Sequence, residues 1–250
     1  YLNTDKVEVT SDVMNYYTVN GVVTSKKMEI GLVSGTENTA NWVGLADVSL
    51  IYYGVSDVEL SENDTELSVQ DGLYCNATVE QNLTADGWIL VALPFDLTSE
   101  KVKKVFDDVK ALDALEVNGS ACDLKFVDVR AMTAGVPYLV KAKETGLTYT
   151  CEKVRINKGA YATGAVTMKS GDVTLTLCGT DGVKTLDNTN AYYYTGSIFL
   201  RGEVGEEVKG LSAYVVLEGA NNLHFMNIYV DGELVDVQNI KATSADKKVT

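Results

Sequence analysis

The sequence predicts an all-β fold, an antiparallel β-sandwich with one short amphipathic helix near residues 99–110. Two observations support this class: apolar and polar residues alternate in a series of short segments, and turn-forming dipeptides separate those segments. A third is composition, because the aromatic residues are mostly tyrosine, with 14 Tyr against 5 Phe and 2 Trp. Tyrosine suits a pleated surface, where its ring packs and its hydroxyl stays hydrated.

The alternation is clear in "MEIGLV" (residues 28–33) and in "DVTLTL", where Val173, Leu175 and Leu177 alternate with threonine. Between such runs lie dipeptides that favour tight turns with positive φ. They are Asn20-Gly21, Asn118-Gly119, Ser170-Gly171 and Asp231-Gly232. Hairpins at this spacing predict a sandwich or a barrel rather than a parallel α/β sheet.

The stretch "GWILVALPFDLT" (residues 87–98) departs from this alternation. Trp88–Leu93 is apolar on both faces, so we expect a central strand covered on each side, which Pro94 ends because proline has no N–H to donate. Thr98 or Ser99 can then cap a helix. Four apolar residues keep the spacing of one helix face: Val102, Val105, Phe106 and Val109. A helix packed beside the sheet accounts for the apolar strand, so we predict an architectural role for this stretch.

Three segments are expected along the chain. Residues 1–54 form a β unit that ends before the polar, acid-rich passage "VSDVELSENDTELSVQDG". Alone, 54 residues make a thin sandwich, so we interpret this unit as the C-terminal remnant of a larger β domain. Residues 55–240 are predicted to be a β-sandwich domain with one helix, and residues 241–250, which are polar and small, a linker or tail.

Charge and hydropathy exclude several partners. The formal net charge of −14 argues against nucleic acid, since phosphate binding needs clustered Lys and Arg, and it disfavours anionic lipid. Solubility is the simplest reason for the acidity. No apolar run reaches the ~18 residues of a membrane span. Because the chain has no signal peptide and begins at Tyr1 without Met, we expect a processed or shortened product.

The four cysteines, Cys75, Cys122, Cys151 and Cys178, would allow three disulfide pairings. However, Cys122 and Cys151 each share a strand face with large apolar residues, which predicts small buried thiols. Cys178 shares its face with threonines, so its environment stays open. With no C-x-x-C spacing and a single His, no zinc site is expected.

Catalytic arrangements find little support in the sequence. A Ser-His-Asp triad would need His224 as its base, yet "NLHFMNIYV" places His224 in a strand and no G-x-S-x-G motif is present. Asp96 and Glu100 could be a carboxylate pair for glycoside hydrolysis, but Asp96 more simply accepts N–H groups of a turn or helix. The acidic stretches 61–66 and 187–190 offer oxygen ligands without following a calcium-loop template. No catalytic residue, metal or cofactor is therefore assigned.

Adjacent aromatic residues are the most informative functional feature. They are Tyr16-Tyr17, Tyr52-Tyr53 and Tyr192-Tyr193-Tyr194, with Trp42 before the second pair. Neighbouring strand residues point to opposite faces, so each pair sends one ring away from the core or into a second interface. Exposed rings can stack on the apolar faces of sugars. We therefore assign Trp42, Tyr52 and Tyr53 as candidate ligand-binding residues, the alternative being ordinary tyrosine on a half-hydrated sheet.

Several motifs resemble parts of large surface proteins of Gram-negative gut anaerobes. "ANWVGLADVSLIYYG" resembles the last strand of their jelly-roll or concanavalin-like modules. "GWILVALPFDLT", "AGVPYLVKA" and "KGLSAYVVLEG" together resemble an uncharacterised β-sandwich region that follows such modules, and "VQNIKATSADKKVT" the lead-in to a C-terminal sorting-type domain. The resemblance implies jelly-roll-like units, with residues 1–54 the end of a jelly-roll or lectin-like module. It transfers no activity to a residue.

Three functions stay open. The first is a non-catalytic extracellular or cell-surface protein, adhesive or glycan-binding, that is an accessory part of a larger polysaccharide-handling protein. Its partner would be a polysaccharide or a host or cell-surface glycan, and the oligomeric state is undetermined. The others are a carboxylate-based glycoside hydrolase and a structural spacer. Two facing carboxylates in a deep cleft would distinguish the hydrolase.

Because the cysteines are predicted to be buried thiols, adding a reducing agent should leave the melting temperature nearly unchanged. A native disulfide would contribute about 2 to 4 kcal/mol to the free energy of unfolding. A fall of several degrees in a calorimetric melt under reduction would contradict the prediction.

Overall fold

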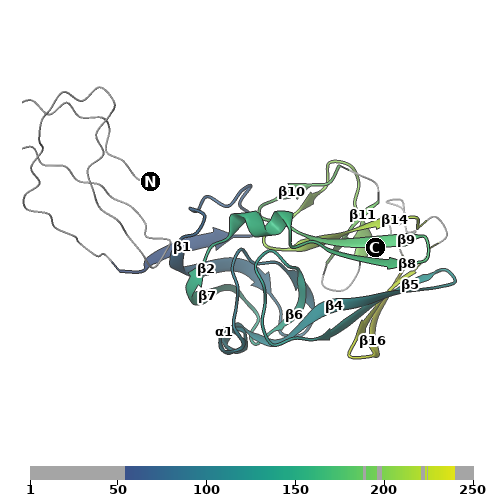
Figure 1. Ribbon diagram of the computed structural model, residues 1–250, viewed down its shortest axis with the longest axis horizontal. Coiled ribbons are helices and arrows are strands. Elements are labelled where there is room, and N and C mark those ends of the chain that lie inside the picture. The colour runs from purple at the N-terminus through teal and green to yellow at the C-terminus, as the bar shows by residue number, and fades with distance from the viewer. Residues whose placement is uncertain (1–53, 188–189, 196–198, 221–222, 224, 240–250) are drawn as a thin grey trace, which may run out of the picture. The chain divides into compact units, whose positions relative to one another are not determined.

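The computed structural model describes residues 54–187, 190–195, 199–220, 223 and 225–239 (Figure 1). The chain divides into two compact units, Tyr1–Gly54 and Val55–Thr250. The predictions for the β unit 1–54, including the Asn20-Gly21 turn, and for the tail 241–250 lie outside the described residues. The described part consists mostly of β-strands with one short α-helix, which confirms the predicted all-β class.

Two large sheets form the body of the second unit. The six-stranded sheet has the order β16-β15-β5-β4-β6-β3 and is antiparallel except where β15 runs parallel to β5. The five-stranded sheet has the order β12-β11-β14-β9-β8 and is antiparallel throughout. The strands of the six-stranded sheet are β3 (Ile89–Val91), β4 (Phe106–Asn118), β5 (Ala121–Asp128), β6 (Tyr138–Ala142), β15 (Phe225–Val230) and β16 (Glu233–Asn239). Those of the five-stranded sheet are β8 (Val166–Ser170), β9 (Val173–Gly179), β11 (Ala191–Tyr194), β12 (Phe199–Arg201) and β14 (Ala213–Glu218).

These two sheets pack face to face, and their inward side chains make one hydrophobic core. On β9, Val173, Leu175 and Leu177 are buried while the threonines between them are half-buried, as the alternation predicts. They meet inward residues of the opposite sheet such as Leu124 and Phe126 of β5. The result is the predicted β-sandwich.

A third layer covers part of the other face of the six-stranded sheet. It is a three-stranded sheet of β1 (Ser56–Ser61), β2 (Tyr74–Leu83) and β7 (Gly146–Arg155), in the order β1-β2-β7. Tyr149 of β7 packs edge-on against Phe106 of β4, with ring centroids 5.9 Å apart. The start of β4, together with β6 and β3, therefore lies between two layers. This is why the β6 sequence "YLVKA" has only one residue, Lys141, that is not buried.

The double coverage explains the apolar stretch around β3, but not in the way the sequence predicted. Leu90 points into the sandwich core and the neighbouring Val91 is fully buried, so the strand is covered on both faces as expected. However, β3 is the edge strand of its sheet, not a central one. The loop that contains Leu211 and Ser212 closes the free edge of β3. The Ala92 N–H donates to the Leu211 carbonyl at 3.1 Å. Ser212 Oγ donates to the Leu90 carbonyl at 3.3 Å.

After β3 the chain runs through a buried junction, residues 92–97, that is hydrogen-bonded to several distant segments. The Leu93 carbonyl accepts the Gly135 N–H at 2.8 Å, and the Pro94 carbonyl accepts the Asn157 N–H at 2.6 Å. Tyr161, from the 3-10 helix Lys158–Ala162, donates its hydroxyl to the Ala92 carbonyl at 2.9 Å. These contacts hold distant segments of the chain together, which is the architectural role predicted for this stretch.

Glycines let backbones approach one another beside this junction. Gly135 has a φ of +71°, and a Cβ there would lie 2.3 Å from the Ala160 carbonyl carbon. A Cβ on Gly164 would lie 2.3 Å from the Gly135 carbonyl oxygen, and one on Gly179 would lie 2.8 Å from the Ala92 Cβ. Real Cβ atoms do not come this close, so side chains larger than hydrogen would separate these segments.

The predicted helix exists but is shorter than the sequence indicated. Helix α1 spans Ser99–Val105 after the N-cap Thr98, whose side chain makes no capping hydrogen bond, and it packs on β4 and β7. Phe106 and Val109, predicted to continue it, belong to β4. A β-bulge between Phe106 and Asp108 puts Phe106 and Val109 on one face at a spacing of three, which imitates a helix. Among the described residues, no helix has the length and apolar character needed to cross a membrane.

Three of the predicted hairpins are present. Gly119 and Gly171 each have positive φ, 61° and 58°, at the first position of two-residue loops that join β4 to β5 and β8 to β9. Asp231 and Gly232 join β15 to β16, both with positive φ. The positive φ that these dipeptides were predicted to supply is confirmed at each turn.

All four cysteines are free thiols. Cys75, Cys122 and Cys151 are buried, which confirms the prediction for Cys122 and Cys151, and Cys178 is half-buried. Burial raises the pKa of both the Cys122 and Cys151 thiols to about 12, so these groups are neutral at physiological pH.

Replacing Gly135 with Ala should destabilise the protein more than replacing Gly119, although both have positive φ. A Cβ on Gly119 meets open space, so only backbone strain of about 1–2 kcal/mol is expected there. At Gly135 the clash with Ala160 should add about 1–3 kcal/mol. Urea unfolding of the two variants measures the difference, and equal losses would show that the backbones beside the junction can move apart.

Candidate functional site

The aromatic residues assigned from the sequence as candidate ligand-binding residues are not among those the structure describes. Trp42, Tyr52 and Tyr53 lie outside the described residues, and so do Tyr16-Tyr17. The same holds for His224, the single histidine. Their assignments therefore stay predictions.

The tyrosine triplet is described, and it follows the strand alternation. Tyr192 and Tyr194 point into the sandwich core, where the Tyr194 ring lies 5.0 Å from that of Phe199. Tyr193 points the other way and packs with Tyr214 against a small second cluster of Leu186, Ala191 and Val208. The prediction that one ring of such a set enters a second interface is confirmed.

A two-stranded ribbon, β10 (Lys184–Thr185) and β13 (Glu207–Val208), contributes to this second cluster. The Tyr193 hydroxyl donates to Glu206 Oε1 at 2.5 Å. Burial, and then the hydrogen bond to Glu206, raise the pKa of Tyr193 to about 12. The phenol is therefore protonated at physiological pH and ties the loop before β13 to the sheet.

The acidic residues considered for catalysis are held in structural contacts. Asp96 Oδ1 accepts the backbone N–H of Ala134 at 2.8 Å, which confirms the predicted turn hydrogen bond. In the stretch 61–66, Asp64 Oδ2 accepts the Ser61 N–H at 3.0 Å, and the buried Glu62 pairs with Lys209. Within the described ranges, no group of three or more His, Cys, Asp or Glu is arranged to hold a metal ion.

One cluster of carboxylates converges on a buried lysine, which sequence reasoning did not find. Lys110 of β4 has a side chain only 4% exposed, and its ammonium lies 3.0 Å from Asp108, 3.1 Å from Asp128 and 2.5 Å from Asp231. Asp108 is two residues away on the same strand, Asp128 pairs with Lys110 on β5, and Asp231 comes from the β15–β16 turn. The ion-pair cluster thus ties three segments of the six-stranded sheet together.

Burial alone would lower the pKa of the Lys110 ammonium, but hydrogen bonds to Asp231, Asp108 and Asp128 outweigh it and raise that pKa above its usual range. The lysine therefore stays charged throughout the physiological range. Asp108, Asp128 and Asp231 are therefore engaged in holding a cationic side chain.

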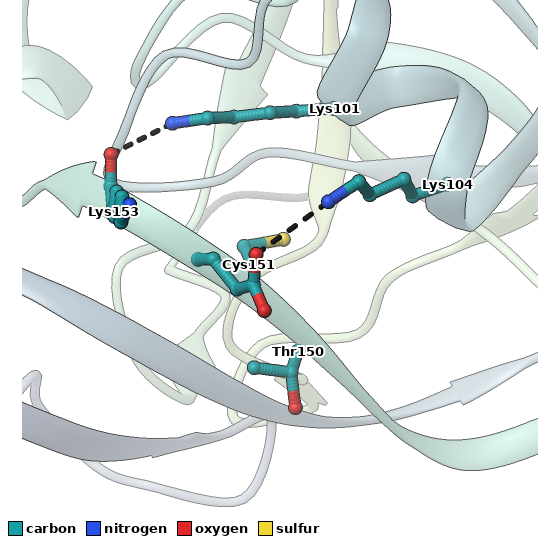
Figure 2. A pocket seen from close by; sticks show the side chains of 6 residues that line it. Lys101, Lys104, Thr150, Cys151 and Lys153 are labelled. Atoms are coloured by element: carbon teal, nitrogen blue, oxygen red, sulfur yellow. Dashed lines mark hydrogen bonds and ion pairs between the residues drawn. The ribbon is translucent and has the colours of Figure 1, made fainter.

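The described residues also form a hollow between α1 and β7, with a volume of about 80 Å³ (Figure 2). Most of its surface is apolar, and three of the six residues that line it are lysines: Lys101, Lys104, Thr150, Cys151, Glu152 and Lys153. Figure 2 shows Lys101 and Lys104 extending from α1 toward β7. The Lys101 ammonium donates to the Lys153 carbonyl at 2.7 Å, and the Lys104 ammonium lies 3.5 Å from Glu152 Oε2.

Three lysines and one glutamate give this hollow a positive charge within a chain of net charge −14. Cys151 adds no negative charge, because its buried thiol stays protonated. The Lys104–Glu152 pair is exposed on both sides, 67% and 64%, so it is weak and readily exchanged. The arrangement can attract an anion but contains no nucleophile and base in contact.

Sequence reasoning missed this hollow because its lysines come from two elements about 50 positions apart. The run "SEKVKK" was interpreted only as the start of an amphipathic helix, and Lys153 was given no role. The sequence signal for this hollow was the concentration of lysine within one helical turn of an otherwise acidic chain.

Comparison of the chain with protein-family models, with curated proteins and with solved structures finds no match. The functional conclusion therefore rests on the sequence, the fold class and the local geometry.

Replacing Lys110 with Met should destabilise the fold, because three carboxylates would face one another without a counter-charge. Losing one partner of a buried pair costs about 3–5 kcal/mol, and because the three aspartates are exposed to solvent on one side, screening reduces the expected loss to about 1–3 kcal/mol. Lys125→Met is the matched control on the next strand, since its pair with Glu116 is exposed and should contribute less than about 1 kcal/mol.

Chemical denaturation at low and at high salt measures both variants. Salt should recover part of the Lys110→Met loss by screening the repulsion between aspartates. Equal losses in the two variants would contradict a structural role for the ion-pair cluster.

Proposed function

We propose that the chain is a non-catalytic module of an extracellular or cell-surface protein, adhesive or glycan-binding, and an accessory part of a larger polysaccharide-handling protein. The non-catalytic part of this proposal is supported by the contacts that the carboxylates make. Asp108, Asp128 and Asp231 surround the Lys110 ammonium, and Asp96 holds a backbone N–H.

Glycoside hydrolysis by a carboxyl pair needs one group that keeps its proton near neutral pH, through burial or a neighbouring like charge. The carboxylates of Asp108, Asp128 and Asp231 instead converge on one ammonium and hold it by ion pairs. The layered sheets support a scaffold role, because their junction is fixed by backbone hydrogen bonds from distant segments.

The glycan-binding part of the proposal is supported by the sequence. Trp42, Tyr52 and Tyr53 supply three aromatic rings within twelve residues, in a segment that resembles the end of a lectin-like module. Aromatic rings bind the apolar faces of sugars, and neighbouring polar side chains bind the hydroxyls. A spacer without ligand is the competing function, since a rigid sandwich can also hold other domains apart.

Titration calorimetry of the chain with plant, mucin and host-matrix polysaccharides tests the proposal. Stacking on one or two rings without a deep pocket should give a dissociation constant on the order of 0.1 to 1 mM, so biological use would depend on multivalency. Trp42→Ala should abolish the heat of binding. Tyr74→Ala is the matched control, because Tyr74 is an aromatic residue 44% exposed on β2 and should not affect binding.

If none of these polysaccharides gives heat, the chain is a spacer. If binding occurs and both variants retain it, the aromatic assignment is wrong while glycan binding stands.

A further inference from the structure

The hollow between α1 and β7 is held in shape by an unusual backbone conformation. Lys153 has a φ of +53°, in the left-handed region where residues other than glycine are strained. It lies in a β-bulge of β7 opposite Asn76 of β2, whose Oδ1 accepts the Lys153 N–H at 3.1 Å. A second hydrogen bond, from Asn76 Nδ2 to Asp57 at 2.8 Å, fixes that asparagine.

The bulge has a direct effect on the charge in the hollow. It brings the Lys153 carbonyl to 2.7 Å from the Lys101 ammonium, so the side chain of Lys101 is held across the hollow by a neutral acceptor. An ammonium has three donors, and this contact uses one. The charge of Lys101 therefore stays available to a ligand, next to that of Lys104, whose pair with Glu152 is long and exposed.

The hollow has room for more than water. One water needs about 10–15 Å³ of such volume, and about 80 Å³ admits a group of several heavy atoms. Its charged donors are lysines, which act as compact point charges, rather than arginines, whose planar fork matches a carboxylate. Because point charges with rotatable donors impose no planar geometry, this donor set can hold a tetrahedral oxyanion such as sulfate.

We infer that this hollow binds the sulfate groups of a sulfated glycan, through Lys101, Lys104 and Lys153. The inference rests on the proposed glycan-binding function and names the class of ligand for a site separate from the candidate aromatic residues. Lysine clusters attract anions over a distance set by salt, so a local positive site allows an acidic protein to hold a polyanion. Phosphate shares the chemistry of sulfate, and the experiment separates the two sources.

The test measures binding of the 250-residue chain to immobilised heparin by surface plasmon resonance. The Lys101→Gln/Lys104→Gln variant should bind at least tenfold more weakly. The matched control is Lys169→Gln/Lys184→Gln, which removes the same charge from two exposed lysines of β8 and β10 and should stay within twofold of the parent chain. Desulfated heparin should bind at least tenfold more weakly than heparin.

Lys153→Gly gives an independent readout, because glycine adopts positive φ without strain. This variant should unfold at the same or a higher denaturant concentration than the parent chain and yet bind heparin more weakly. A variant that keeps both its stability and its full affinity would contradict the role of Lys153.

Other outcomes overturn the inference in distinct ways. Equal weakening in the two double variants would mean that net charge alone governs binding. Saturable binding of inorganic phosphate without any response to heparin would exclude a glycan source. Heat from neutral polysaccharides together with no heparin response would overturn this inference and leave the proposed function standing. No response to any glycan would overturn both.

Discussion

Burial of one sheet on both faces is the constraint on which the rest of this structure depends. The strands β3, β6 and the start of β4 have the sandwich core on one side and the three-stranded sheet on the other. A strand covered on both faces has little room for polar side chains, which is why β3 is apolar throughout and β6 has one charged residue, Lys141. The chain leaving β3 must also satisfy its backbone without water, which it does by bonding to Gly135, Asn157 and Leu211.

Periodicity predicted the features that depend on local rules. The alternating residues of β9 face the core, and glycines with positive φ close the hairpins at Gly119 and Gly171. It failed where a non-local feature decides. The pattern of apolar side chains along a strand depends on whether its two faces are covered, not on whether hydrogen-bonded strands lie on both sides of it. The edge strand β3, which a loop closes, was therefore predicted to be central. The bulge near Phe106 produced a spacing of three within a strand, and that spacing was interpreted as helix.

The charged clusters could not be predicted for the same reason. Lys110 meets Asp231 across 121 residues, and Lys101 meets the Lys153 carbonyl across 52, so neither contact leaves a local signature. The two clusters use lysine in opposite ways. One ammonium is enclosed by three carboxylates and stabilises the sheet, whereas the lysines at α1 keep exposed charge beside a hollow. Burial of the ammonium, rather than residue type, separates a structural lysine from a candidate binding one.

The loop that closes the free edge of β3 bears on the aggregation of the protein at high concentration. A short apolar strand with a free edge is the kind of segment that templates intermolecular pairing and fibril growth. Leu211 blocks that edge, although its φ of +56° is strained, and Gln81 secures it by donating to its carbonyl at 2.8 Å. The strained residue is thus part of the contact that keeps the edge of β3 from pairing with another chain.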